Sequence, residues 1–127
     1  MKLRISKPLK RSYWQDSVPA GVPCTPLAGE ARADVAIIGG GFVGLWTALA
    51  IRQNEPDCRV VVLEQDICGG GASGRNGGFV MSWWPKIASL RAFCSADQAL
   101  FLGRAAESAI SEIGEFCREN AIDAHFV

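Results

Sequence analysis

The sequence predicts an α/β protein organised around a βαβ unit, in which two parallel strands flank a helix. Two observations carry this prediction. An apolar run at Val35–Ile38 leads directly into a glycine cluster and an apolar helical stretch. A second apolar run, at residues 59–63, follows a proline-containing turn and ends in an acid. Short apolar runs without alternation are typical of strands buried on both faces of a parallel sheet.

The helix of this Rossmann-like unit is expected from about Phe42 to Gln53, directly after the glycine cluster. The turn Asn54-Glu55-Pro56-Asp57 ends it, because proline lacks the N–H and clashes with the preceding turn. Two parallel strands joined through such a helix take a right-handed crossover in nearly all proteins.

Gly39, Gly41 and Gly44 fill a GxGxxG pattern at the strand-to-helix turn. In that pattern the glycines permit a sharp turn, close approach of a pyrophosphate and close packing of the helix. The N–H groups at the helix start favour phosphate. Glu64 follows twenty residues after Gly44. A carboxylate at this position accepts hydrogen bonds from the ribose hydroxyls and repels a 2′-phosphate. The pattern predicts dinucleotide binding other than NADP, and the alternative is a glycine turn used only for packing.

A second glycine-rich string spans residues 68–78, where six of eleven residues are glycine. Its backbone N–H groups can wrap a ligand, and Ser73, Arg75 and Asn76 add side-chain donors. Ligand contact is therefore predicted for this loop, with a flexible linker as the alternative.

Residues 1–32 are expected to form an irregular N-terminal extension, since Pro8, Pro19, Pro23 and Pro26 punctuate them. Five basic residues precede the first acid, Asp16. A solvated extension is favoured over a targeting leader, although a mitochondrial transit peptide stays open. Tyr13 and Trp14 are expected to pin this arm to the domain surface by packing.

A long helix is expected to start at an N-cap, Ser95 or Asp97, and to reach about Asn120. Its apolar stripe repeats every three or four residues and consists of Leu102, Ala106, Ile110, Ile113 and Cys117. Residues 121–127 then alternate like the beginning of a strand. We therefore expect residues 33–127 to be the N-terminal part of a dinucleotide-binding domain, incomplete without the rest of a larger chain.

The composition predicts a globular, cytoplasmic protein with no nucleic-acid partner and no membrane span. The 13 basic and 13 acidic residues balance, and no apolar stretch approaches the roughly 20 residues of a spanning helix. The cysteines Cys24, Cys58, Cys68, Cys94 and Cys117 form no CxxC pair, so no metal site is predicted and reduced thiols are expected. His125, the only histidine, is assigned a packing or surface role.

Residues 33–80 resemble the D-amino-acid-oxidase-like family of FAD-dependent oxidoreductases, which contains glycine and sarcosine oxidases, and within it the bacterial amine-oxidising members. The residues that carry the resemblance are 34–48, 61–64 and the string Gly71-Ala-Ser-Gly-Arg-Asn-Gly-Gly78. That string is the most specific of the three, because ordinary NAD-binding Rossmann domains lack it. Residues 92–127 are more loosely similar to the next helix and strand of the family.

The resemblance implies FAD, with its ADP half on the first glycine cluster and Glu64, and its pyrophosphate along Ala72 and Ser73. The implied cofactor-binding residues are Gly39, Gly41, Phe42, Val43, Gly44, Glu64, Gln65, Ala72, Ser73, Arg75, Asn76, Gly77 and Gly78. The last four would lead toward the isoalloxazine ring.

The implied reaction is oxidation of a small amine or amino acid to an imine, with production of hydrogen peroxide. The family's substrate domain has no counterpart in these 127 residues, so no catalytic residue is assigned and the chain alone is expected to be inactive. Two alternatives stay open: an NAD-dependent dehydrogenase, in which the loop at 71–78 would have no role, and a non-catalytic nucleotide-binding fragment.

Overall fold

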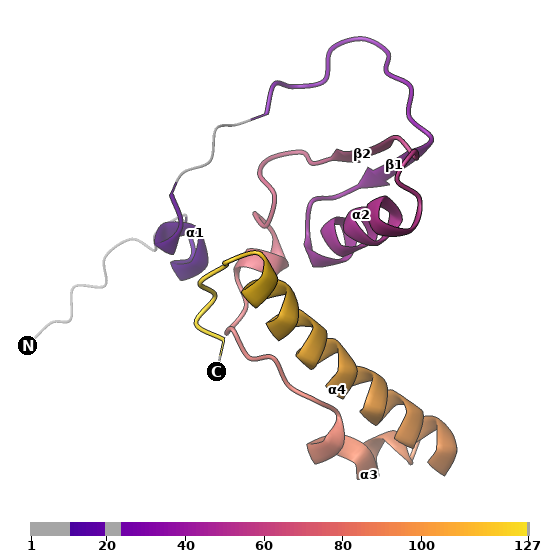
Figure 1. The fold of residues 1–127 in the computed structure, drawn as a ribbon. Coiled ribbons are helices and arrows are strands. Elements are labelled where there is room, and N and C mark those ends of the chain that lie inside the picture. Colours follow the sequence, from indigo (N-terminus) through magenta and orange to yellow (C-terminus); the bar gives the residue numbers. More distant parts are fainter. Residues whose placement is uncertain (1–10, 20–23, 127) are drawn as a thin grey trace, which may run out of the picture. The chain divides into compact units, whose positions relative to one another are not determined.

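The computed structural model describes residues 11–19 and 24–126. It divides into two compact units, Met1–Gly77 and Gly78–Val127. The first unit contains α1 (Tyr13–Ser17), β1 (Val35–Ile38), α2 (Phe42–Asn54), β2 (Val60–Leu63) and the 3-10 turn η1 (Ala72–Gly74) (Figure 1). The second contains η2 (Trp84–Lys86), α3 (Ile87–Leu90) and α4 (Ala96–Glu119).

The first unit is built on the predicted βαβ arrangement. β1 and β2 pair in parallel, with Val35 opposite Val60 and Ile38 opposite Leu63. α2 joins the two strands and packs against both (Figure 1). The helix is one residue longer than expected and the second strand one residue shorter, although the Arg59 carbonyl still accepts the N–H groups of Asp34 and Val35. The α/β prediction is confirmed.

The strands are not buried on both faces, so that expectation is wrong for the described chain. Residues along β1 alternate between half-buried and exposed, and Ile38 is 80% exposed. The physical reason is that the sheet has two strands among the described residues, and α2 is the helix that packs against it. Ala99 of α4 is the one fully buried apolar residue in the described ranges.

The expectation of a wholly irregular N-terminal extension is wrong at α1. Ser12 caps this helix, because its Oγ accepts the Gln15 N–H at 3.2 Å while Gln15 Oε1 accepts the Ser12 N–H at 3.0 Å. This reciprocal pair is a capping box, and its Ser-x-x-Gln signature is visible in the sequence. Of the five basic residues near the N-terminus, Arg11 lies 3.6 Å from Asp16, and the other four lie outside the described residues.

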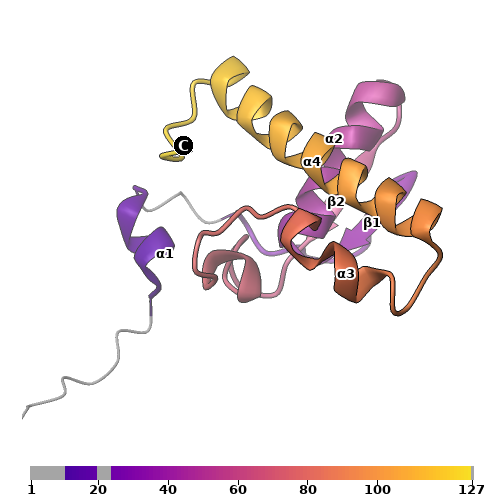
Figure 2. The same cartoon turned by 90° about the horizontal axis from the view of Figure 1, so that it is seen from below.

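The second unit is dominated by α4, which Ser95 caps through a second capping box with Gln98. The predicted apolar stripe is half-buried at four of its five positions, but Leu102 is exposed. The neighbouring Gly103 is buried instead. The Trp84 ring covers it, and the nearest ring atoms lie 3.1 Å from the position that a Cβ on Gly103 would take. Trp84 Nε1 also donates to Glu107 at 3.1 Å. α3 packs beside the same helix (Figure 2).

The predicted strand at residues 121–127 does not form. Residues 121–126 are a turn followed by irregular chain, and Val127 lies outside the described residues. Ala121 and His125 have φ angles of 51° and 49°, whereas a strand requires negative φ. The Ile122 N–H is taken by the Cys117 carbonyl at 2.8 Å, and the Phe126 ring lies against Gly114. The second unit, to which this run belongs, contains no strand among its described residues.

An ion pair joins the starts of the two strands, and its protonation should lower the free energy of unfolding in acid. Arg59 donates to Asp34 through Nε at 3.0 Å and Nη2 at 2.9 Å, and this lowers the pKa of Asp34 from 3.8 to about 2. A lowered folded-state pKa stabilises the fold above the unfolded-state value, and this stabilisation is lost as pH falls through the folded-state value.

We therefore expect the unfolding midpoint in urea to drop between about pH 4 and pH 2, with a shallower drop in Asp34→Asn. Asp57→Asn, which removes another carboxylate near β2, should retain the wild-type profile. An Asp34→Asn profile that overlays the wild type would contradict the assignment.

Gly44→Ala should destabilise the first unit. A Cβ on Gly44 would lie 2.0 Å from the Gly39 carbonyl oxygen and 3.2 Å from Ile37 Cγ2, so the backbone of the turn must move. We expect a loss of about 1–3 kcal/mol in the free energy of unfolding, as for other overpacked sites.

Gly71→Ala is the matched control, because no atom lies within 4 Å of its Cβ position. It should change the free energy of unfolding by no more than about 0.5 kcal/mol. Equal stability of the two variants in chemical denaturation would show that α2 does not approach β1 this closely.

Candidate functional site

The turn between β1 and α2 brings the helix start to the carboxyl end of the strand. Gly39 adopts φ 103°, a conformation that residues with a Cβ rarely adopt, and its N–H donates to the Leu63 carbonyl at 2.8 Å. The first N–H groups of α2 have no partner within the helix, so this end attracts negatively charged groups.

Glu64 follows β2 directly and is fixed beside this turn. Its Oε2 accepts the Gly40 N–H at 2.8 Å, and its Oε1 accepts the Asp66 N–H at 3.1 Å. These two hydrogen bonds, that from Gly40 first, lower the pKa of Glu64, so the side chain is a carboxylate at neutral pH. The site therefore has a fixed negative charge beside the helix N-terminus.

Ser73 brings the second glycine string to the same helix end. Its Oγ accepts the Phe42 N–H at 2.9 Å. A Cβ on Gly41 would lie 2.9 Å from that Oγ, which is closer than such atoms approach. The Gly69 N–H adds a backbone link to the Gly40 carbonyl at 2.9 Å. The two glycine clusters are therefore joined by two hydrogen bonds, and they approach closely at Gly41.

The loop around Ser73 also folds on itself. Arg75 Nε donates to the Gly70 carbonyl at 2.8 Å, and Asn76 Nδ2 donates to the Ser73 carbonyl at 2.7 Å. These two hydrogen bonds connect residues that follow η1 in the sequence to the loop backbone.

A pocket of about 290 Å³ lies at this junction. It is lined by Gly41, Glu64, Gln65, Asp66, Gly69, Gly70, Gly71, Ala72 and Ser73. Five of the predicted residues are thus brought together there: Gly41, Glu64, Gln65, Ala72 and Ser73.

The other predicted residues lie outside this lining. Gly39 and Gly44 form the turn behind the pocket, while the Phe42 and Val43 side chains are exposed at the helix start. Arg75, Asn76 and Gly77 continue the loop, and Gly78 belongs to the second unit. The prediction did not include Asp66 or Gly69–Gly71, although the same glycine-rich string contains three of the four.

The junction fits the ADP half of a dinucleotide. Glycines of both clusters line the pocket, so no Cβ there would keep a pyrophosphate from the backbone, and the Glu64 carboxylate stands beside them for ribose hydroxyls. Among the described residues no group of three His, Cys, Asp or Glu side chains could hold a metal ion. The described helices also include none that is long and apolar enough to cross a bilayer.

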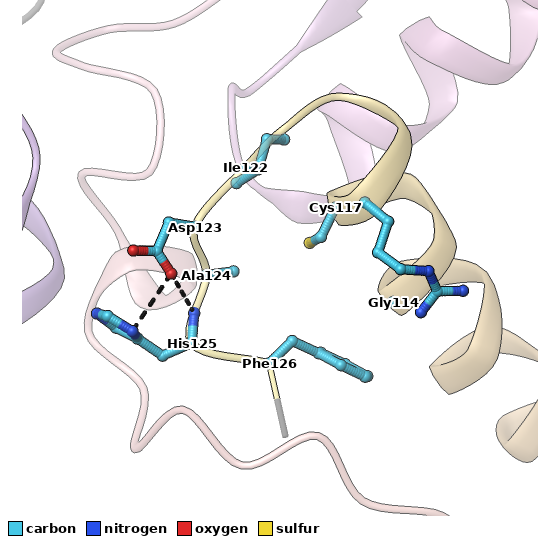
Figure 3. A pocket seen from close by; sticks show the side chains of 8 residues that line it. Gly114, Cys117, Ile122, Asp123, Ala124, His125 and Phe126 are labelled. Atoms are coloured by element: carbon cyan, nitrogen blue, oxygen red, sulfur yellow. Dashed lines mark hydrogen bonds and ion pairs between the residues drawn. The ribbon is translucent and has the colours of Figure 1, made fainter.

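A second pocket, of about 350 Å³, lies beyond the C-terminal end of α4 (Figure 3). His125 lies there beside Asp123, with Nδ1 3.3 Å from Oδ1, and both side chains are largely exposed. Figure 3 shows the His125 ring turned away from the Cys117 sulfur, so these residues form no nucleophile–base pair. The predicted surface role of His125 agrees with this position.

Three curated proteins show what the chain is similar to. It is 38% identical over 109 residues to gamma-glutamylputrescine oxidoreductase of Escherichia coli, an alignment that covers 85% of this chain and 24% of that protein. It is 33% identical over 119 residues to the probable oxidoreductase OrdL of Rhizobium meliloti, covering 91% and 27%. It is 27% identical over 124 residues to thiamine thiazole synthase of Aspergillus fumigatus, covering 98% and 29%.

The chain thus spans about a quarter of the length of these relatives. No solved structure gives a significant match. The sequence profile of the family described as FAD dependent oxidoreductase matches residues 34–127, which include the βαβ unit, the glycine-rich loop and α4. The protein therefore belongs to this family of FAD-dependent oxidoreductases, whose cofactor is FAD.

Proposed function

We propose that this chain supplies the ADP-binding part of the FAD site in a flavin-dependent oxidase that acts on an amine or amino acid. The observation that carries the proposal is the junction at which Glu64 and Ser73 both reach the start of α2. In this proposal residues 33–127 are the N-terminal part of the FAD-binding domain, and residues 1–32 precede it.

Each part of the junction has a chemical task in this proposal. Glu64 accepts hydrogen bonds from the adenosine ribose, and its charge disfavours a 2′-phosphate. The N–H groups at the start of α2 and of η1 face the pyrophosphate, which displaces the Ser73 hydroxyl from the Phe42 N–H. Residues 75–78 continue from there toward the flavin ring.

The proposed chemistry is that of the cofactor. With FAD bound, the site would supply an acceptor for a hydride from the α-carbon of the amine; loss of a proton from the nitrogen completes the imine, and oxygen would take the two electrons to give hydrogen peroxide. The amine class is supported by the name of the Escherichia coli relative, which states a putrescine derivative. In this proposal the residues that contact the substrate belong to the family's substrate domain, which has no counterpart in these 127 residues.

The protein that naturally contains this chain should purify with flavin bands near about 375 and 450 nm. Anaerobic addition of a primary or secondary amine should bleach the band at longer wavelength, and admission of air should restore it with one equivalent of peroxide per amine. A protein that lacks flavin but is stabilised against thermal unfolding by NAD would contradict the proposal in favour of a dehydrogenase. Flavin without amine-dependent bleaching would reject the amine class alone.

Glu64→Gln should weaken FAD binding by about tenfold or more, because an amide can accept only one of the two N–H groups and loses the charge-assisted bond to ribose. The measurement is quenching of FAD fluorescence on titration with protein. Glu55→Gln, the same chemical change at the C-terminal end of α2, should bind FAD as the wild type does. Equal affinities for all three proteins would remove Glu64 from the site.

A further inference from the structure

The helix α1 lies against the glycine-rich loop, far away in the sequence. Trp14 Nε1 donates to the Asn76 carbonyl at 2.9 Å across 62 positions, and Gln15 Nε2 donates to the Gly69 carbonyl at 3.4 Å across 54 positions. The Gln15 amide also lies 3.6 Å from the Cβ position of Gly74. The two helix residues thus reach the two ends of one loop.

α1 itself is held by local contacts. A helix of five residues is far below the roughly 12 residues at which isolated helices become marginally stable. The capping box at Ser12 and Gln15 closes its first turn, and Arg11 pairs with Asp16. Gln15 therefore uses both ends of its amide, with Oε1 in the cap and Nε2 on the loop.

The loop needs such support because of its composition. Glycine loses more conformational freedom on ordering than any other residue, and residues 68–78 contain six glycines. The bonds inside the loop join neighbours only five or fewer positions apart. By contrast, α1 ties the two ends of the loop to one capped helical turn, and between those ends lies Ser73, which contacts the start of α2.

We infer that α1 is a clamp that orders the glycine-rich loop for the cofactor, with Trp14 and Gln15 as its positioning residues. This inference rests on the proposed function, because it treats the loop as the pyrophosphate-binding segment. A loop that is already ordered loses less freedom when the ligand binds, so a clamp raises affinity without touching the ligand. By linkage, FAD bound to the loop should in turn hold α1 in place.

Two substitutions remove the hydrogen bonds from α1 to the loop and leave the helix itself intact. Gln15→Glu keeps an acceptor for the Ser12 N–H, since glutamate also completes a capping box, but it has no donor for the Gly69 carbonyl. Trp14→Phe keeps an aromatic ring and loses the N–H that bonds Asn76. Tyr13→Phe is the matched control, because Tyr13 is 70% exposed and contacts the Trp14 ring through its edge, which phenylalanine retains.

The first readout is amide hydrogen exchange without FAD, measured in the natural protein that contains this chain. The loop amides of Gly69, Gly70, Gly74 and Arg75 all donate to backbone carbonyls. They should exchange about two- to tenfold faster in Trp14→Phe and Gln15→Glu, as expected for the loss of one hydrogen bond. The Asp16 amide in α1 should keep its wild-type rate in Gln15→Glu. Tyr13→Phe should match the wild type throughout.

The second readout is the dissociation constant for FAD, which should rise about two- to tenfold in the same two variants and not in Tyr13→Phe. Unchanged loop exchange in both variants overturns the inference, as does faster loop exchange with unchanged FAD affinity. If the unaltered protein binds no FAD, the proposed function fails, whereas the exchange measurement still decides whether α1 orders the loop.

Discussion

The first unit depends on the close approach of α2 to the end of β1. The Gly39 carbonyl occupies space that any Cβ on Gly44 would need, so glycine at position 44 lets the helix begin this close to the strand end. The consequence is electrostatic: the helix start, whose first N–H groups have no partner within the helix, lies at the carboxyl edge of the sheet. Glu64, which follows the neighbouring parallel strand, reaches the same edge.

The second glycine string, residues 68–78, forms the other part of the pocket at the sheet edge. Ser73 and the Gly69 N–H bind it to the first cluster, and Trp14 and Gln15 hold its ends from the other direction. Hydrogen bonds thus take the place of the apolar packing that a loop of glycines cannot provide. Such an arrangement leaves the loop backbone accessible while restricting its conformations, which is what recognition of a pyrophosphate requires.

The sequence was informative wherever one short-range pattern decided the structure. The spacing of the glycines, the apolar runs and Ser95 predicted both strands, α2 and α4 to within one or two residues. It was misleading where contacts with other elements decide the structure. In the described part of the chain the apolar strands are not buried because they lack further neighbouring strands, and the run at 121–126 forms no strand because it has no partner strand. α1 was not predicted, because the surrounding prolines suggested irregular chain. Ser12 and Gln15 nevertheless have the sequence pattern of a capping box. Tyr13 and Trp14 were expected to pin the arm to the domain surface, and Trp14 does contact residue 76, but no pattern in the sequence identified residues 69–76 as the partner.

The central claim is that the junction of α2 with residues 69–73 binds the ADP half of FAD. The most direct test is titration of the ¹⁵N-labelled protein with ADP, followed by amide chemical shifts. The largest shifts should occur at residues 40–42, which form the turn into α2, and at residues 71–73, which line the pocket, and the amides of α4 should stay unchanged. Saturation with ADP that leaves residues 40–42 and 71–73 unshifted, or that moves α4 most, would contradict it.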